Sequence, residues 1–276
     1  MKIDHEAKTI TFRQSWLNNY FNCPEQVRRL MLEPDEDQSS DAAILGTGVH
    51  AYAELRLLGE DRVVATAAAF NALDHEFSLP HRIVQMSEDK VYSFIPAMLA
   101  SFERDLLPQV ERGGECEVEF KLLLGEWNGW TIYVSGTIDY VAPSGDLWDW
   151  KTAGRKYEKW EKERWAIQPT IYSFAAVTLG KSEYPVRWRY GIVLKSPVKR
   201  PETQVVEFYR REGHIEWVTH QIYSILETHR FDIDLQENCG GTLASPLVPW
   251  VKNDQHALCS EKWCPFWSTC KGQFVV

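Results

Sequence analysis

The sequence predicts an α/β protein in which helices precede and follow a group of strands. Helical patterns dominate the first 110 residues, and five runs rich in β-branched and aromatic residues follow between residues 116 and 208. Apolar residues make up 44% of the 276 residues and aromatic residues 13%, which argues against a disordered chain. No apolar stretch approaches the roughly 20 residues that cross a bilayer, and no secretory signal is evident. We therefore expect a single cytoplasmic domain that spans residues 1–276.

The expected helices and strands follow from local signals. Ser15 suits the N-cap of a first helix that ends near Leu32. Pro169 suits the first turn of a helix that reaches Thr178, which places Gln168 at the mouth of that helix. Further helices are expected at 46–59, 62–77, 87–110 and 214–229, and strands at 116–124, 130–141, 147–151, 187–194 and 203–208. The C-terminal section, rich in Pro, Gly and Cys, is expected to be irregular.

The most informative segment, residues 136–151, is predicted to form a β-hairpin. Residues 143–145 (Pro-Ser-Gly) supply turn chemistry. If the loop is these three residues, with its glycine in the left-handed conformation, Asp139 lies directly opposite Asp149. Side chains alternate along a strand, so Lys151 points to the same face as Asp149. Two carboxylates and a lysine would then converge, which suits a divalent metal ion and a hydrolytic water.

An acid-x-Lys triplet is weak evidence by itself, because most such triplets are solvated charge pairs. The chain contains three others, and Glu119-Phe120-Lys121 is the next candidate among them. The surroundings distinguish Asp149-Trp150-Lys151, because Trp148 and the pair Ile138 and Tyr140 make them apolar. Charges that are buried persist when they are paired or bind metal. We therefore favour the triplet at 149–151 as the site.

Four short motifs in order carry a family resemblance. They are Gly-x-x-x-His (Gly46 to His50), Gly-x-x-Asp (Gly136 to Asp139), Asp-x-Lys (Asp149 to Lys151) and Gln-x-x-x-Tyr (Gln168 to Tyr172). This set resembles the RecB-like branch of the PD-(D/E)XK nuclease superfamily, which includes CRISPR-associated and AddB-type iron–sulfur exonucleases. The resemblance implies a restriction-endonuclease-like fold, with a mixed central sheet flanked by helices, a helical insertion and a catalytic core at about 42–212.

The resemblance also implies a metal site in a DNA phosphodiester hydrolase. His50, Asp139, Asp149 and the carbonyl oxygen of Trp150 would bind Mn²⁺ or Mg²⁺, and the imidazole favours Mn²⁺. Such an ion lowers the pKa of a bound water and neutralises charge on the phosphate. One of two acidic residues on the preceding strand, Glu117 or Glu119, is expected to be an outer metal ligand.

The same resemblance implies functions for three further residues. Lys151 would orient or deprotonate the water, and both roles are open. Gln168 would position Lys151 or the water. Tyr172 would contact the substrate backbone, although a place in the core is an equal alternative.

Four of the six cysteines form a pattern. Clustered thiols in an intracellular protein more often bind metal than form disulfides, and four thiolates suit zinc or an iron–sulfur cluster. The pattern resembles the 4Fe–4S site of AddB-type and CRISPR-associated nucleases, in which the cluster would join the segments 15–32 and 239–276. Zinc stays open, because four residues rather than two separate the first pair of the C-terminal triplet. The four are Cys23, Cys259, Cys264 and Cys270, whereas Cys116 and Cys239 are expected to be buried apolar residues.

The net charge of −9 would argue against a nucleic-acid partner, but a groove needs only local positive potential. Residues 155–165 hold five basic residues interleaved with Tyr157, Trp160 and Trp165, a pattern that suits stacking of bases and contact with phosphates. The alternative is that Glu158, Glu161 and Glu163 neutralise the basic residues in a salt-bridged helix face.

The expected function is therefore a metal-dependent DNA exonuclease that acts on single strands or free ends in recombination, repair or phage DNA processing. Two alternatives remain open. One is a CRISPR adaptation nuclease that trims DNA within a complex, and the other is an inactive nucleic-acid-binding or assembly protein. A recombinase or adaptation protein is a candidate partner, and an oligomer is possible.

Overall fold

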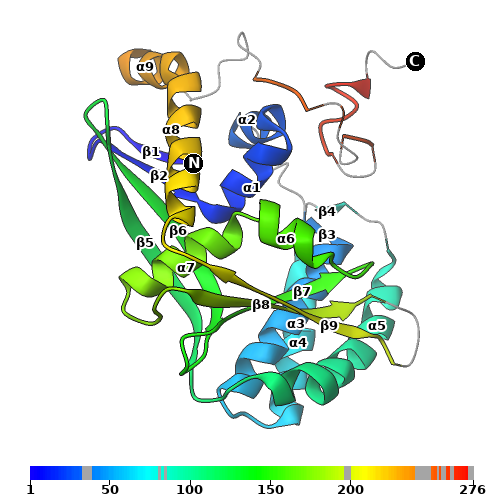
Figure 1. Ribbon diagram of the computed structural model, residues 1–276. Coiled ribbons are helices and arrows are strands. Elements are labelled where there is room, and N and C mark those ends of the chain that lie inside the picture. The colour runs from blue at the N-terminus through cyan, green and yellow to red at the C-terminus, as the bar shows by residue number, and fades with distance from the viewer. Residues whose placement is uncertain are drawn as a thin grey trace. The chain divides into compact units, whose positions relative to one another are not determined.

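The computed structural model describes residues 1–32, 39–79, 82–83, 86–195, 200–239, 250–253, 255, 259–261 and 264–272. These residues form a mixed α/β fold, with helices flanking a mixed sheet (Figure 1). The chain divides into two compact units. Unit 1 comprises residues 1–38, 121–136 and 216–276, and unit 2 comprises residues 39–120 and 137–215. The two long strands β5 (Glu115–Trp127) and β6 (Trp130–Val141) run from one unit into the other.

Unit 1 contains the two ends of the chain and most of helix α8. Strands β1 and β2 pair antiparallel, and β2 lies parallel to the first half of β6, with Ile10 opposite Ile132. Neither β1 nor β2 was expected from the sequence, whereas the helix predicted at 214–229 is confirmed as α8. The elements are β1 (Lys2–Asp4), β2 (Thr9–Arg13), α1 (Gln14–Asn22), α2 (Pro24–Leu32), α8 (His214–Thr228) and α9 (Arg230–Cys239).

The predicted single helix from Ser15 to Leu32 is wrong. The chain forms two helices that meet at Cys23, whose backbone is extended at φ −159° and ψ 106°. Steric conflict with the following proline disfavours the helical conformation at this position, so Pro24 ends one helix and opens the next. The first helix also begins earlier than expected, with Arg13 as its N-cap and without a side-chain cap.

Unit 2 contains several pairs of neighbouring strands, among them the short parallel pair β3 and β4. Strand β6 pairs antiparallel with β7, β7 pairs parallel with β8, and β8 pairs antiparallel with β9. The helix predicted at 62–77 is confirmed, and that predicted at 87–110 is an α-helix followed by a π-helical and a 3₁₀ turn. The elements are β3 (Ser39–Ser40), α3 (Asp41–Leu57), α4 (Arg62–Ser78), β4 (Arg82–Ile83), α5 (Glu88–Ser101), η2 (Phe102–Leu106), η3 (Leu107–Gln109), β7 (Leu147–Ala153), α6 (Lys159–Trp165), α7 (Gln168–Thr178), β8 (Val186–Leu194) and β9 (Thr203–Arg210).

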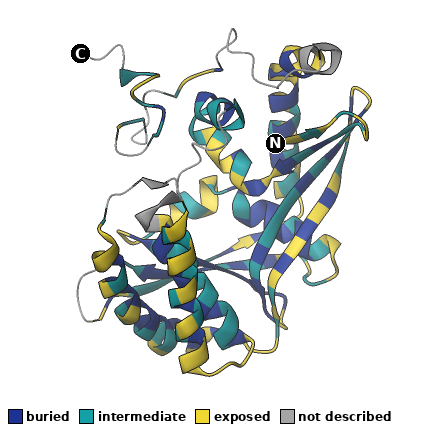
Figure 2. Ribbon diagram, turned by 180° about the vertical axis from the view of Figure 1, so that it is seen from behind, coloured by how far each residue is buried: buried dark blue, intermediate teal, exposed yellow. Residues whose placement is uncertain are grey.

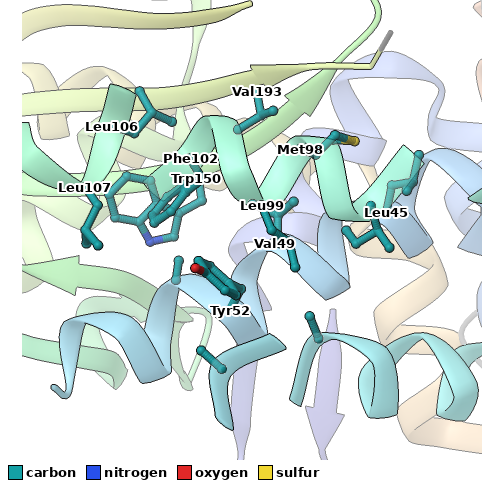
Figure 3. Packing of buried hydrophobic residues seen from close by; sticks show 14 of the residues in the cluster. Leu45, Val49, Tyr52, Met98, Leu99, Phe102, Leu106, Leu107, Trp150 and Val193 are labelled. Carbon is teal, nitrogen blue, oxygen red and sulfur yellow. The ribbon is translucent and has the colours of Figure 1, made fainter. Parts of the chain in front are cut away.

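The two faces of β7 carry different chemistry. Trp148 and Trp150 are fully buried, stack on each other at 5.3 Å and belong to the core that β7 shares with α3 and α5 (Figure 3). Gly191 lies opposite Trp150 on β8, and a Cβ atom there would come within 2.5 Å of the indole. Asp149 and Lys151 alternate with the tryptophans and therefore point to the opposite face.

The first half of strand β5 has one covered face and one face in solvent. Buried and exposed positions alternate along the first half of β5, as expected of a strand with one face on a core and one in solvent (Figure 2). No helix within the described residues is long and apolar enough to cross a bilayer.

Candidate active site

The β6–β7 hairpin has the predicted loop. The N–H of Ala142 donates to the carbonyl oxygen of Asp146 at 2.9 Å, and the N–H of Gly145 donates to the carbonyl oxygen of Ala142 at 2.8 Å. Gly145 has φ +82°, the left-handed conformation that glycine adopts without a steric penalty. Residues 143–145 therefore form the three-residue loop, as the sequence predicted.

The register of this hairpin brings Asp139 next to Asp149. Tyr140 pairs with Trp148, so the next position along the two strands would pair Asp139 with Asp149. The backbone ladder ends before that position, and the N–H of Trp150 instead donates to Oδ2 of Asp139 at 2.8 Å. The strands thus separate where the carboxylates meet, which leaves room for side chains from neighbouring elements.

Asp149 is fully buried, and both its oxygens are used by neighbouring side chains. Oδ2 forms an ion pair with the Lys151 ammonium, whose side chain is 30% exposed. Oδ1 accepts a hydrogen bond from Nε2 of Gln168 at 2.7 Å. Gln168 is the first residue of α7, as the adjoining Pro169 predicted. Asp149 and Lys151 therefore lie together as predicted, and Gln168 contacts Asp149 rather than Lys151.

Asp149 and Lys151 each stabilise the charged form of the other. Burial raises the pKa of Asp149 to about 6, against the opposing effect of Lys151. Burial alone would lower the pKa of Lys151, but the carboxylates of Asp149 and Asp139 outweigh it and hold that pKa above its ordinary value. Lys151 therefore stays protonated, and its ammonium group is paired with the carboxylate of Asp149.

His50 reaches the same place from helix α3. Its Nε2 atom lies 2.7 Å from the carbonyl oxygen of Trp150, and its Nδ1 atom lies 3.4 Å from Oδ2 of Asp139. His50 lies within α3, which begins at Asp41 rather than at Gly46 as expected. Gly48 allows the close packing of α3, because a Cβ atom there would lie 3.2 Å from side-chain atoms of Leu73 and Ile95.

Within the described part of the chain, one set of three side chains has the geometry of a cation site. Ligand atoms of His50, Glu117 and Asp139 all lie within 4.8 Å of one another. Of the two acidic candidates on β5, the structure places Glu117 in this set and leaves Glu119 outside it. Glu117 has φ +49°, an uncommon conformation for a residue with a side chain, and such conformations concentrate at functional sites.

The electrostatics of Glu117 fit a cation site. Burial first, and then the charge of Asp139, raise the pKa of Glu117 to about 7. Acidic groups that repel one another in this way are stabilised by a cation between them. Nitrogen and carboxylate oxygen are suitable ligands for Mn²⁺, and carboxylates also for Mg²⁺.

Two residues from the predicted metal set occupy other positions. Asp149 lies outside the set of three and holds Lys151 and Gln168 instead. The carbonyl oxygen of Trp150 faces His50, where it fixes the orientation of the imidazole. Partners of this kind around a ligand would tune its metal affinity, and the part of Asp149 and of the Trp150 carbonyl oxygen in binding a metal stays a prediction.

Tyr172 lies in the core rather than at the surface of the site. It is 6% exposed and packs edge-on against Phe120 and at a tilt against Trp188, at 5.5 Å and 5.8 Å. Burial raises the pKa of Tyr172 to about 12, and the adjacent Gln168 amide lowers it. This position suits a residue that supports Gln168 better than one that touches a nucleic-acid backbone.

The four cysteines of the predicted pattern line one pocket in unit 1. Cys23, Cys259, Cys264 and Cys270 all line this pocket, and Arg29, Lys252 and Lys271 also line it. Burial raises the pKa of the Cys264 thiol, a backbone hydrogen bond involving Phe266 lowers it, and the other three cysteines raise it. Four thiols around one pocket, with cations that would stabilise thiolates, fit either zinc or an iron–sulfur cluster.

Helix α2 is joined to the C-terminal segment beside this pocket. Glu25 is 1% exposed, pairs with Arg28 and Arg29, and accepts a hydrogen bond from the backbone N–H of Trp250 at 2.9 Å. Arg29 in turn donates to the hydroxyl of Thr269 at 2.9 Å. Residues 240–249, part of the predicted cysteine region, lie outside the described residues.

Comparisons with known proteins bear on the fold and the superfamily of the chain. The crystal structure of a "putative exonuclease" from Eubacterium rectale resembles the chain with a TM-score of 0.52 and 15% sequence identity, over 94% of this chain and 92% of that chain. At such identity the likeness shows the fold alone. No protein with a curated description matches. The family model of the PD-(D/E)XK nuclease superfamily matches residues 12–271, so the chain belongs to that superfamily.

Proposed function

We propose that the protein is a metal-dependent DNA exonuclease of the RecB-like branch of its superfamily. The observation that supports this most is the position of the possible cation ligands His50, Glu117 and Asp139 beside the ion pair of Lys151 and Asp149. Members of the superfamily use divalent metal ions. The site thus combines a place for a cation with a separate fixed positive charge.

One set of residues would bind the metal, and another would act on the attacking water. His50, Glu117 and Asp139 would hold Mn²⁺ or Mg²⁺, which when bound would acidify a water and neutralise phosphate charge. Oδ2 of Asp139 accepts from the N–H of Trp150 and faces Nδ1 of His50, and a carboxylate oxygen has a second lone pair that a cation can use.

Lys151 would act as a cation rather than as a base. The carboxylates beside it hold its pKa above the ordinary value, so it keeps its proton near neutral pH. It would orient the attacking water and stabilise the negative charge that develops on the phosphate. Asp149 and Gln168 would fix its position, since a site of this kind depends on the placement of its charges.

The substrate form and the cysteine pocket complete the proposal. Single strands or free ends in recombination, repair or phage DNA processing remain the substrates that the family resemblance favours. The four thiols would hold a 4Fe–4S cluster or zinc, which would join α2 to the C-terminal segment. The bound cluster or zinc ion would have a structural role, because the free energy of binding it would add to the free energy of folding.

A cleavage assay tests the function. Purified full-length protein is incubated with end-labelled linear single strands, linear duplexes and circular single strands, with Mn²⁺, Mg²⁺ or a chelator. We expect metal-dependent loss of linear strands, short products, and survival of the circles. Asp139→Asn should be inactive in the same preparation. A folded, metal-loaded protein that cleaves none of these substrates would refute the proposal, and rapid cleavage of circles would show an endonuclease instead.

A further inference from the structure

Two tryptophans are exposed together on the short helix α6. Trp160 is 56% exposed and Trp165 is 59% exposed, and their rings meet edge-on at 5.2 Å with planes 74° apart. By contrast, Trp148, Trp150 and Trp188 of the same unit are at most 2% exposed. Adjacent exposed indoles contribute little to a core, so this pair points to a binding role.

The helix lies in the segment that joins two residues of the proposed active site. Strand β7 carries Lys151, and α7 begins with Gln168, so residues 154–167 connect them. Burial raises the pKa of Tyr157, which precedes α6, and the charge of Lys151 opposes that rise. The Tyr157 ring also meets the Tyr190 ring edge-on at 5.8 Å, and Tyr190 on β8 is paired with Asp149 on β7, so Tyr157 lies beside the site.

Polar contacts hold the segment against β9. The Tyr157 N–H donates to the side chain of Gln204 at 2.8 Å, and that side chain donates back to the Tyr157 carbonyl oxygen at 2.9 Å. Arg210 donates to the carbonyl oxygens of Lys162 and Ala166 at 3.4 and 3.2 Å. Trp160 and Trp165 therefore lie on a segment that hydrogen bonds hold against β9.

The charge around the pair favours an anionic partner. Residues 155–165 contain five basic and three acidic residues. Lys156 pairs with Glu202 from outside the segment, and Lys162 pairs with Glu161 at 3.7 Å. Arg155, Lys159 and Arg164 are exposed and form no salt bridge with any described residue. The segment thus keeps a small excess of positive charge, and its acidic residues Glu158 and Glu163 are exposed as well.

We propose that Trp160 and Trp165 form a stacking platform for the unpaired bases of a single strand whose phosphate lies at the site. The inference rests on the proposed function and identifies the substrate as unpaired nucleic acid. Indole faces stack any base, and nearby cations follow the phosphates. Bases in a duplex have their faces covered by their neighbours, so the platform would discriminate against paired strands.

The test measures binding without cleavage. Fluorescence anisotropy follows a labelled short oligothymidylate, an abasic strand of the same length and a blunt duplex, all in the presence of a chelator. Trp160→Ala/Trp165→Ala should weaken oligothymidylate binding at least tenfold, because stacking on an aromatic side chain contributes substantially per base. Trp160→Phe/Trp165→Phe should retain most of the affinity. Binding of the abasic strand and the duplex should change less than twofold.

Trp217→Ala provides the matched control, because Trp217 is 52% exposed on α8 and should leave all three affinities unchanged. Unchanged oligothymidylate binding by the double alanine variant would overturn the inference, as would an equal loss for the abasic strand. If the wild-type protein cleaves DNA but the double variant binds normally, only this inference fails. If the wild-type protein neither binds nor cleaves any strand, the proposed function fails with it.

Discussion

The imidazole of His50 donates a hydrogen bond to the carbonyl oxygen of Trp150 across 2.7 Å, because a carbonyl oxygen can only accept. In a neutral imidazole the other nitrogen, Nδ1, then carries a lone pair. That nitrogen faces the carboxylate of Asp139 at 3.4 Å. Two acceptors that face each other in this way are stabilised by a cation between them. The contact with Trp150 therefore leaves Nδ1 of His50 directed at Asp139, where the proposed cation would bind.

Glu117 and Glu119 provide a direct test of the cation site. Both lie on the same face of β5, but only Glu117 joins His50 and Asp139. Glu117→Gln should weaken Mn²⁺ binding about 10- to 100-fold and reduce cleavage, because it removes one anionic ligand. Isothermal titration calorimetry with Mn²⁺ measures the effect, and Glu119→Gln is the control. Equal weakening by both substitutions would place the metal elsewhere.

Removing the charge of Lys151 should separate chemistry from metal binding. Lys151→Met should lower the cleavage rate by at least about 100-fold, since charge stabilisation by one preorganised donor has that size. Mn²⁺ affinity should stay within about threefold. The fully buried Asp149 would lose its ion-pair partner, so we expect a loss of up to about 3 kcal/mol in the free energy of unfolding.

A surface lysine controls for this effect. Lys181 pairs with Glu115 outside the site, so Lys181→Met should keep the wild-type rate and stability. Normal cleavage by Lys151→Met would refute the role of the triplet at 149–151.

Local chemistry explains what the sequence could predict. The loop at 143–145 follows from its own turn residues, and the position of Gln168 follows from Pro169, so both could be predicted correctly. The break at Cys23 had a local signal in Pro24, which the prediction of one long helix overlooked. Strand β2 is short and pairs with β6 more than a hundred residues away, so no local pattern announced it.

The candidate set of cation ligands depends on tertiary contacts. The alternation of side chains placed Glu117 and Glu119 on one face, but only the approach of α3 with His50 selects Glu117. Similarly, the length of the hairpin loop placed Asp149 near Asp139. The partners of the two Asp149 oxygens, however, are Lys151 and Gln168, and strand spacing does not identify them. Side-chain pairing across separate elements cannot be read from strand periodicity.

The cysteine pocket predicts a difference between two groups of thiols. Cys23→Ser, Cys259→Ser, Cys264→Ser or Cys270→Ser should each reduce bound metal and lower the unfolding temperature, because metal binding and folding are coupled. Anaerobically purified protein should be brown if the pocket holds an iron–sulfur cluster and colourless with zinc. Metal analysis and visible absorption distinguish these results.

Cys116→Ala serves as the control for the four cysteines. Cys116 lies on β5, where its thiol contacts the carbonyl oxygen of Glu54 in α3 and burial raises its pKa to about 11, so the substitution should not affect metal content. A metal-free wild-type protein of full stability would contradict both forms of the cysteine site.

His229 predicts a dependence of stability on pH. It is 5% exposed, stacks on Trp250 at 3.7 Å and is hydrogen-bonded to the Tyr20 hydroxyl at 2.8 Å. Burial lowers the pKa of His229 below 6.5, although the charge of Asp232 opposes the shift. The unfolded chain therefore binds a proton at a higher pH than the folded chain. This contribution to stability is complete above about pH 6.5 and is lost as the pH falls below that value.

Urea unfolding at a series of pH values measures this contribution. His229→Phe keeps the stacking on Trp250 but removes the titration, so the free energy of unfolding should depend less on pH between about 5 and 7 than in the wild type. The slope should decrease by up to about 1.4 kcal/mol per pH unit, the effect of one proton. His220→Gln, an exposed change on the preceding helix α8, should preserve the wild-type slope. Identical slopes for the wild type and His229→Phe would mean that His229 is not held in its neutral form by the folded protein.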